Sequence, residues 1–426
     1  MQFASVAIKH LTIVLHPRDL VRLSENERMC SCHQKIGYPM KLLLTTHSLA
    51  NPGGMERVLV NKITWLKKHT DWEILVVTTD QMGRDLFYPV PEGIRIVDLG
   101  INYSEDNGKG FAAKVLGYLR RRRLHRKRLE RLLMEVRPDI VDCQYPGECG
   151  FVPALKDGSR KVMELHQSKL FHYQYNRSGL MGLADRYRAW TDERLVRKFD
   201  RFVVLTEEDA AMWGDIPGMR VIPNAALNLG TAVTQTYESG TADSIEDRKR
   251  VIAVGRLDYQ KGFDRLIDAW GIVQKDGRFA DWRLDIFGQG EWREMLQNQI
   301  EGLGLNDSAR LNSPVKDIDN EYRNSSFLVM SSHYEGFPMV MVEAMSLGLP
   351  VVTFDYKCGP KDIIDHGKNG LMVKDGDIQV LADAMMSLMA SPGTLAGMAA
   401  EARKVTDKFS EEKVMGMWVR LYEGLK

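Results

Sequence analysis

Short apolar segments alternate with longer amphipathic segments through most of the chain. In the first half, apolar runs rich in β-formers recur, and a segment of helical period separates the first two: the runs are 41–46, 73–78, 140–142, 161–164 and 201–206, and the helical segment is 56–68. Short buried strands that alternate with helices predict a parallel sheet with helices on both faces.

The second half repeats this pattern. Its predicted strands are 250–254, 283–287, 327–330 and 350–353, and segments of helical period span 264–274 and 339–347. Between the halves, residues 229–248 are rich in Gly, Thr, Ser and acidic side chains, which is typical of a linker or an exposed loop. The pattern predicts an α/β protein with two doubly wound, Rossmann-like domains that face each other across a cleft.

The same pattern sets the expected domain boundaries. We expect an N-terminal domain at 40–228, a C-terminal domain at 249–407, and a final helix within 408–426 that could pack back on the N-terminal domain. Residues 1–39 have no clear period, and Met40 directly precedes the first strong strand. This segment is therefore either an extension ahead of the natural start or a loosely packed N-terminal segment.

Composition and charge exclude several classes of protein. The 426 residues are 44% hydrophobic and 27% charged with a net charge of +1, so no whole-molecule field attracts nucleic acid. Five cysteines argue against a disulfide framework and favour a reducing, cytoplasmic setting. No apolar run approaches the roughly 18–20 residues that span a bilayer. Cys30, Cys32 and His33 lack a second ligand pair at zinc-finger spacing, so we expect no metal there.

The sharpest local motif is EGFPMVMVE at residues 335–343. It follows a predicted strand, and a helix should begin near Pro338, because proline suits the first turn of a helix. Free amides and the helix dipole at such a start favour an anion. The amides that we expect to be free are those of Phe337, Met339 and Val340.

Two glutamates frame this motif. Gly336 marks the loop that carries Glu335, which would face a sugar, while Glu343 lies about one turn into the helix and could reach a ribose diol. The alternative is that both glutamates only cap and solvate the helix.

A second motif joins a strand to a helix and carries two cations. Arg256 follows the strand at 250–254, and Lys261 precedes the next helix. Arg256 could bind a diphosphate bidentately and Lys261 as a point charge. The alternative is a pair of surface cations. A third and weaker signal is the glycine pair Gly53 and Gly54 after the first strand, which would let the backbone approach a ligand closely.

Together these motifs resemble the family 4 glycosyltransferases, a retaining family with the B-type fold of two Rossmann domains, from about residue 40 to the C-terminus. In that family the C-terminal domain holds the nucleotide sugar and the N-terminal domain holds the acceptor. The resemblance implies that Arg256 and Lys261 neutralise the donor diphosphate. It also implies that Glu343 binds the ribose and that Glu335 binds a sugar hydroxyl near the reacting carbon.

The resemblance extends to the N-terminal domain. Gly54 would approach the donor from the opposite domain, and His166 matches a histidine that the family places near the reacting sugar. Asn224 matches a hinge-side asparagine whose role would be architectural. His47 and His172 are weaker candidates for the active site.

The expected chemistry follows from charge. Breaking the anomeric bond leaves a cationic sugar and a diphosphate anion, which Arg256, Lys261 and the helix-start amides would stabilise. These groups would replace a divalent metal, because no Asp-x-Asp motif stands where it would bind one. No candidate for a covalent nucleophile is evident, so front-face attack assisted by the leaving phosphate is the working hypothesis.

A basic run at 120–128 lies within an amphipathic helix that includes 119–133. Such a helix could contact an anionic membrane surface, attract a lipid-diphosphate acceptor, or simply present a solvated face. A nucleic-acid patch is a further alternative, but no aromatic stacking motif accompanies the run, and we expect no nucleic-acid partner.

The resemblance therefore implies a retaining transferase that moves a hexose or N-acetylhexosamine to a glycan or lipid-linked acceptor in cell-surface polysaccharide synthesis. The segment 356–364 resembles a stretch common in bacterial members, many of which use UDP-sugars, so we expect a UDP-sugar donor and no other cofactor. We expect a cytoplasmic location, peripheral at the inner membrane face. The alternatives are a nucleotide-sugar epimerase or hydrolase of the same fold, and a non-catalytic lipid-binding protein.

Overall fold

The computed structural model describes residues 38–426 except 52, 107, 109, 174–177, 227–247 and 316. Residues Met40–Lys426 form one compact unit. The predicted N-terminal extension, its Cys30–His33 segment and nearly all of the predicted linker at 229–248 lie outside the described residues.

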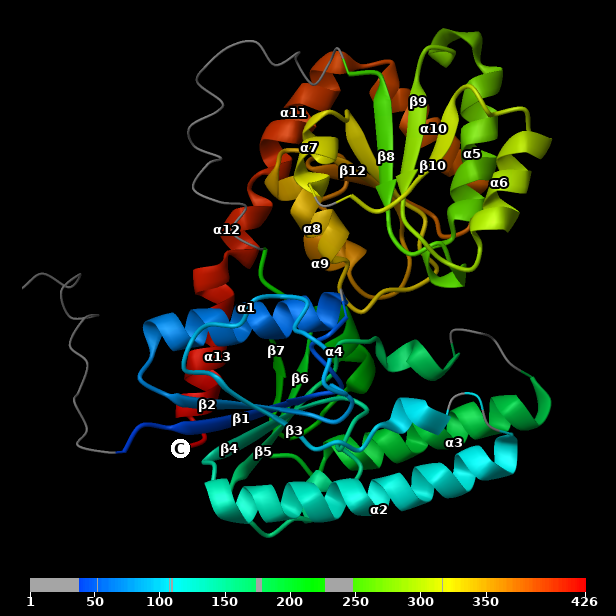
Figure 1. The fold of residues 1–426 in the computed structure, drawn as a ribbon. Coiled ribbons are helices and arrows are strands. Elements are labelled where there is room, and N and C mark those ends of the chain that lie inside the picture. The colour runs from blue at the N-terminus through cyan, green and yellow to red at the C-terminus, as the bar shows by residue number, and fades with distance from the viewer. Residues whose placement is uncertain are drawn as a thin grey trace, which may run out of the picture. The chain divides into compact units, whose positions relative to one another are not determined.

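The first half of the chain forms a seven-stranded parallel sheet in the order β3-β2-β1-β4-β5-β6-β7 (Figure 1). Its strands are β1 (Lys41–Thr46), β2 (Glu73–Thr78), β3 (Arg95–Asp98), β4 (Ile140–Gln144), β5 (Arg160–Glu164), β6 (Arg201–Val204) and β7 (Met219–Val221). Helices cover both faces: α1 (Gly54–His69), α2 (Phe111–Val136), α3 (Gly179–Val196) and α4 (Glu207–Trp213).

Alternation along β1 explains how one strand serves both faces of this sheet. Leu42 and Leu44 pack in the same core as α1, whereas Leu43 packs in the core beneath α2. Successive side chains of a strand point to opposite faces, so an uninterrupted apolar run is what a doubly covered strand requires.

The second half forms a six-stranded parallel sheet in the order β10-β9-β8-β11-β12-β13. Its strands are β8 (Arg250–Val254), β9 (Arg283–Phe287), β10 (Ala309–Asn312), β11 (Phe327–Met330), β12 (Val351–Phe354) and β13 (Gly370–Val373). Its helices are α5 (Phe263–Lys275), α6 (Arg293–Gly302), α7 (Ile318–Arg323), α8 (Met339–Ser346), α9 (Pro360–Ile363), α10 (Ile378–Met389) and α11 (Pro392–Ala402). The two parallel, Rossmann-like sheets confirm the predicted fold class.

The last helices, α12 (Val405–Phe409) and α13 (Glu411–Glu423), return the chain to the first sheet. The Ser410 hydroxyl accepts a hydrogen bond from the Lys413 amide, which caps the start of α13. Trp418 and Tyr422 on α13 share a core with Leu42 of β1. The C-terminal helix is thus part of the core of the N-terminal sheet.

The pattern missed β3, β7, β10 and β13 because these strands lie at sheet edges, and none of the four is fully buried. The predicted strand 201–206 is two residues too long. Thr206 instead caps α4, where its hydroxyl accepts a hydrogen bond from the Asp209 amide.

Candidate functional site

A buried carboxylate lies in the loop after β11, at the carboxyl end of the second sheet. Glu335 is 6% exposed. Its Oε1 accepts hydrogen bonds from Lys261 Nζ at 2.6 Å and Ser332 Oγ at 2.7 Å, and its Oε2 accepts one from Gln260 Nε2 at 3.1 Å. Three donors therefore fix this carboxylate, and the structure joins two residues that the sequence motifs had proposed separately.

The second predicted cation is much more exposed. Arg256 donates to Gln260 Oε1 at 2.7 Å and pairs with Asp258 at 3.2 Å, while 69% of its side chain is exposed. It lines an open pocket of about 360 Å³. A Cβ atom at position 255 would lie 3.0 Å from the Lys261 side chain, so glycine leaves room for that side chain. Gln260 connects Arg256 to Glu335.

Helix α8 begins at Met339, as the predicted helical segment 339–347 does, and Pro338 takes the capping position. The Met339 amide donates to the Phe337 carbonyl at 2.9 Å, so the prediction that this amide is free was wrong: the turn ahead of the helix uses it. Among the described residues, the amides of Phe337 and Val340 have no hydrogen-bond acceptor. The Phe337 ring is buried against Phe409.

Glu343 lies in α8, and the structure places it against the first turn of α1. Its Oε1 is 3.2 Å from Nη1 of Arg57. Burial raises the pKa of Glu343, and the Arg57 charge opposes this shift only in part. Gly54, at the start of α1, has open space where a Cβ atom would stand, so packing alone does not demand glycine there.

Gly336 and His166 meet in this structure. A Cβ atom at position 336 would lie 2.1 Å from the His166 carbonyl oxygen and 3.0 Å from Cα of Gln167. Only glycine allows this backbone approach, which brings together the loop after β5 and the loop before α8.

The His166 ring is buried rather than open to the loop. Its side chain is 4% exposed, and its Nε2 lies 3.2 Å from Oε2 of Glu164. The part of His166 that reaches Gly336 is therefore its backbone carbonyl, while its ring belongs to a buried network.

That network extends to the C-terminal helix. Lys62 Nζ lies 2.5 Å from Glu164 and 3.5 Å from Asp142, and the Tyr422 hydroxyl donates to Asp142. Burial alone would raise the pKa of Glu164, but the Lys62 ammonium and the His166 hydrogen bond lower it below its usual value. Burial and the neighbouring Glu164 charge raise the pKa of Asp142 well above its usual value. One of the two carboxyls thus carries the charge that pairs with Lys62.

The weaker histidine candidates lie elsewhere. His172 Nε2 contacts Asp192 at 2.7 Å, and His47 lines a separate cavity. Asn224 is buried after β7. Within the described ranges, no three His, Cys, Asp or Glu side chains gather so as to hold a metal ion.

The basic run lies on α2, whose two halves differ. Leu129, Leu132 and Leu133 are buried in the core, whereas Leu116 and Leu119 are exposed, so the helix is anchored by its second half. Across the described part of the chain, no helix combines the length and the apolar character needed to cross a membrane.

The fold and these motifs define a class, the glycosyltransferases of the B-type fold. A family model described as Glycosyltransferase Family 4 matches residues 52–226, and one described as Glycosyl transferases group 1 matches residues 238–405. The two matches fall on the two sheets and together span most of the chain. The chain belongs to the family 4 glycosyltransferases.

Relatives and solved structures agree with this assignment. An uncharacterised glycosyltransferase of Haemophilus influenzae is 28% identical over 249 residues, which are 58% of this chain and 67% of the relative. The amylovoran biosynthesis glycosyltransferase AmsD of Erwinia amylovora is 27% identical over 394 residues, which are 89% of this chain and 98% of AmsD.

The structure of TarM superposes with a TM-score of 0.72 at 17% identity, covering 90% of this chain and 98% of TarM. A mutant of TarM from S. aureus, solved in complex with fondaparinux, alpha-GlcNAc-glycerol and UDP, gives a TM-score of 0.68 at 16% identity over 90% of this chain and 99% of that one.

Proposed function

We propose that this glycosyltransferase transfers a hexose or N-acetylhexosamine, with retention of anomeric configuration, from a UDP-sugar to a glycan or lipid-linked acceptor in cell-surface polysaccharide synthesis. The observation that carries the proposal is the fixed Glu335–Lys261 pair beside the start of α8, with Glu343 farther along the same helix. Cations, free amides and carboxylates at the carboxyl edge of one sheet are the groups that bind a nucleotide sugar.

In this proposal the donor diphosphate lies between Lys261, Arg256 and the start of α8. Glu343 accepts hydrogen bonds from the ribose, and Arg57 leaves it when the nucleotide arrives. A UDP donor is supported by the TarM mutant solved with UDP and by the resemblance of segment 356–364 to bacterial members of the family.

The proposed reaction is a front-face displacement. As the anomeric bond breaks, negative charge grows on the diphosphate, and Lys261 and Arg256 stabilise it in place of a divalent metal. Glu335 holds a sugar hydroxyl near the reacting carbon, and the leaving phosphate accepts the acceptor's proton. The His166 carbonyl and Gly336 bring the two loops together around the sugar.

The assignment to polysaccharide synthesis is supported by the similarity to AmsD, an amylovoran biosynthesis glycosyltransferase. Contact with an anionic membrane face through residues 119–133 would bring the enzyme to a lipid-linked acceptor. The exposed Leu119 and the arginines that follow it are consistent with such a contact.

A thermal-shift panel of UDP, GDP and ADP tests the donor site. We expect UDP to raise the Tm most, because it is the nucleotide of the proposed donor. A ligand at 100 times its Kd adds about 2.7 kcal/mol to the free energy of unfolding. Lys261→Ala should weaken UDP binding by roughly 10- to 100-fold, since a hydrogen bond to a charged group contributes about 1.5–3 kcal/mol.

The matched control is Lys275→Ala, which removes an exposed lysine from the opposite end of α5. Its Tm shift with UDP should equal that of the unmodified protein. If no nucleotide raises the Tm, or if both variants respond alike, the proposed donor site is wrong.

A further inference from the structure

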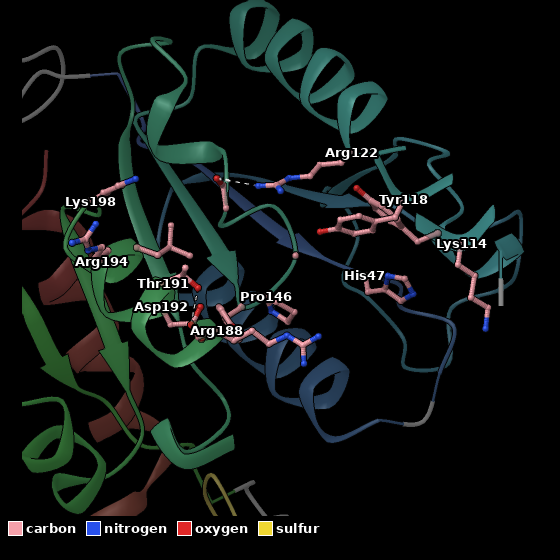
Figure 2. A pocket seen from close by; sticks show the side chains of 15 residues that line it. His47, Lys114, Tyr118, Arg122, Pro146, Arg188, Thr191, Asp192, Arg194 and Lys198 are labelled. Carbon is pink, nitrogen blue, oxygen red and sulfur yellow. Dashed lines mark hydrogen bonds between the residues drawn. The ribbon is translucent and has the colours of Figure 1, made fainter. Parts of the chain in front are cut away.

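A large cavity lies in the N-terminal domain, separate from Glu335 and Lys261. Its volume is about 1040 Å³, and it is bounded by α2, α3 and the loops after β1 and β4. Figure 2 shows Tyr118 and Arg122 of α2 on one wall and Arg188 and Asp192 of α3 on another. None of the sequence motifs predicted this cavity.

The cavity lies at the carboxyl edge of the first sheet, the same edge from which the His166 loop meets Gly336 of the proposed site. His47 directly follows β1, and Tyr145 and Pro146 directly follow β4, so these lining residues stand at the carboxyl ends of their strands. His166 follows β5, which pairs with β4. In open parallel sheets, ligands bind outside the carboxyl ends of the strands.

The lining is strongly basic. Five of its residues are cationic and one is a carboxylate: Lys114, Arg122, Arg188, Arg194 and Lys198 against Asp192. The carboxylate is already engaged, because Asp192 Oδ2 accepts hydrogen bonds from the Tyr145 hydroxyl at 2.8 Å and contacts His172 Nε2 at 2.7 Å. The excess of positive charge is therefore uncompensated by the walls.

Three of these cations are available to a ligand. Among the described residues, Lys114 and Arg122 form no ion pair, and Arg122 donates only to the Gly150 carbonyl at 3.3 Å. Arg188 pairs with Asp185 on its own helix at 3.2 Å, and 54% of its side chain stays exposed. These cations line the cavity from two helices, and guanidinium and ammonium groups bind phosphate through charge-assisted hydrogen bonds.

Aromatic side chains complete the lining. Tyr103, Tyr118 and Tyr145 present rings to the cavity, and Tyr118 is 51% exposed. Such rings offer an apolar face together with a hydroxyl, which suits a carbon skeleton joined to polar groups. A solvated helix face would need neither these rings nor cations from a second helix.

We propose that this cavity binds the acceptor, and that the acceptor carries a phosphate group held by Lys114, Arg122 and Arg188. The inference rests on the proposed transferase function and adds the chemical class of the acceptor. The phosphate belongs either to a lipid-linked diphosphate or to a polyol-phosphate chain, and the two sources share the chemistry that the cavity recognises.

Calorimetric titration with two phosphate probes tests the proposal. sn-Glycerol 3-phosphate represents the polyol phosphate and farnesyl diphosphate the lipid diphosphate, each titrated with UDP at saturation so that the donor site is occupied. The double variant Lys114→Ala with Arg122→Ala should weaken binding by at least 10-fold, because two charge-assisted contacts are lost.

The matched control is Lys67→Ala with Lys68→Ala, which removes the same charge from exposed positions of α1 outside the cavity lining. It should bind both probes like the unmodified protein. Binding of one probe identifies the source of the phosphate, and binding of both shows that the phosphate itself is recognised.

The proposal is overturned if neither probe binds, if the cavity variant binds as well as the unmodified protein, or if the control variant loses affinity equally. The Tm shift with UDP should survive in both variants. If UDP does not raise the Tm of the unmodified protein, the result counts against the donor site instead.

Discussion

Replacing Glu335 by Gln is expected to lower kcat by roughly 10²- to 10³-fold, the loss seen when one preorganised electrostatic group is removed from a reacting centre. The amide keeps the shape of the side chain but removes the charge that pairs with Lys261 at 2.6 Å. It also replaces one acceptor oxygen by a donor, so the contacts from Ser332 and Gln260 cannot all be kept.

Initial rates with a UDP-sugar and an accepted acceptor measure this effect. Glu294→Gln is the matched control, because Glu294 is an exposed carboxylate in the first turn of α6. It should leave kcat unchanged, and both variants should retain the Tm of the unmodified protein within a few degrees. A Glu335→Gln enzyme with near-normal kcat would remove this carboxylate from the reaction.

Replacing Lys62 by Met is expected to lower the free energy of unfolding by about 3–5 kcal/mol, the cost of breaking a buried ion pair from one side. The Lys62 side chain is 1% exposed, and its Nζ also lies 3.4 Å from the centre of the Trp418 ring. Met fills the space of the stem but leaves the charge of Glu164 buried with His166 as its remaining partner.

Denaturant and thermal unfolding measure this loss, with Lys68→Met as the control because Lys68 is exposed on the same helix. The control should change the free energy of unfolding by less than about 0.5 kcal/mol. Adding Glu164→Gln to Lys62→Met should restore part of the stability, since it removes the unpaired charge. A loss below about 1 kcal/mol for Lys62→Met would contradict the proposed role of the network.

The hydrophobic pattern located the buried strands well. The predicted bounds of β1, β8, β9 and β11 agree with the structure residue for residue. Strand β3 escaped notice because its four residues are exposed or half-buried, so its sequence lacks a clear apolar run. A continuous apolar run indicates that a strand is buried on both faces, and an edge strand lacks such a run.

The candidate site divides in the same way. Glu335, Lys261 and Gly336 could be proposed because each stands at a strand-to-helix junction that glycine or proline marks in the sequence. Arg57 and Lys62 could not, since their partners Glu343 and Glu164 lie 286 and 102 residues away. No local period encodes such pairs, and only the fold brings them together.

A structure of the protein with UDP bound tests the central claim most directly. We expect the diphosphate to contact Lys261 and the start of α8, and the ribose hydroxyls to replace Arg57 on Glu343. UDP bound in the cavity between α2 and α3 instead, or on the second sheet without contact to Lys261 or Glu343, would contradict it.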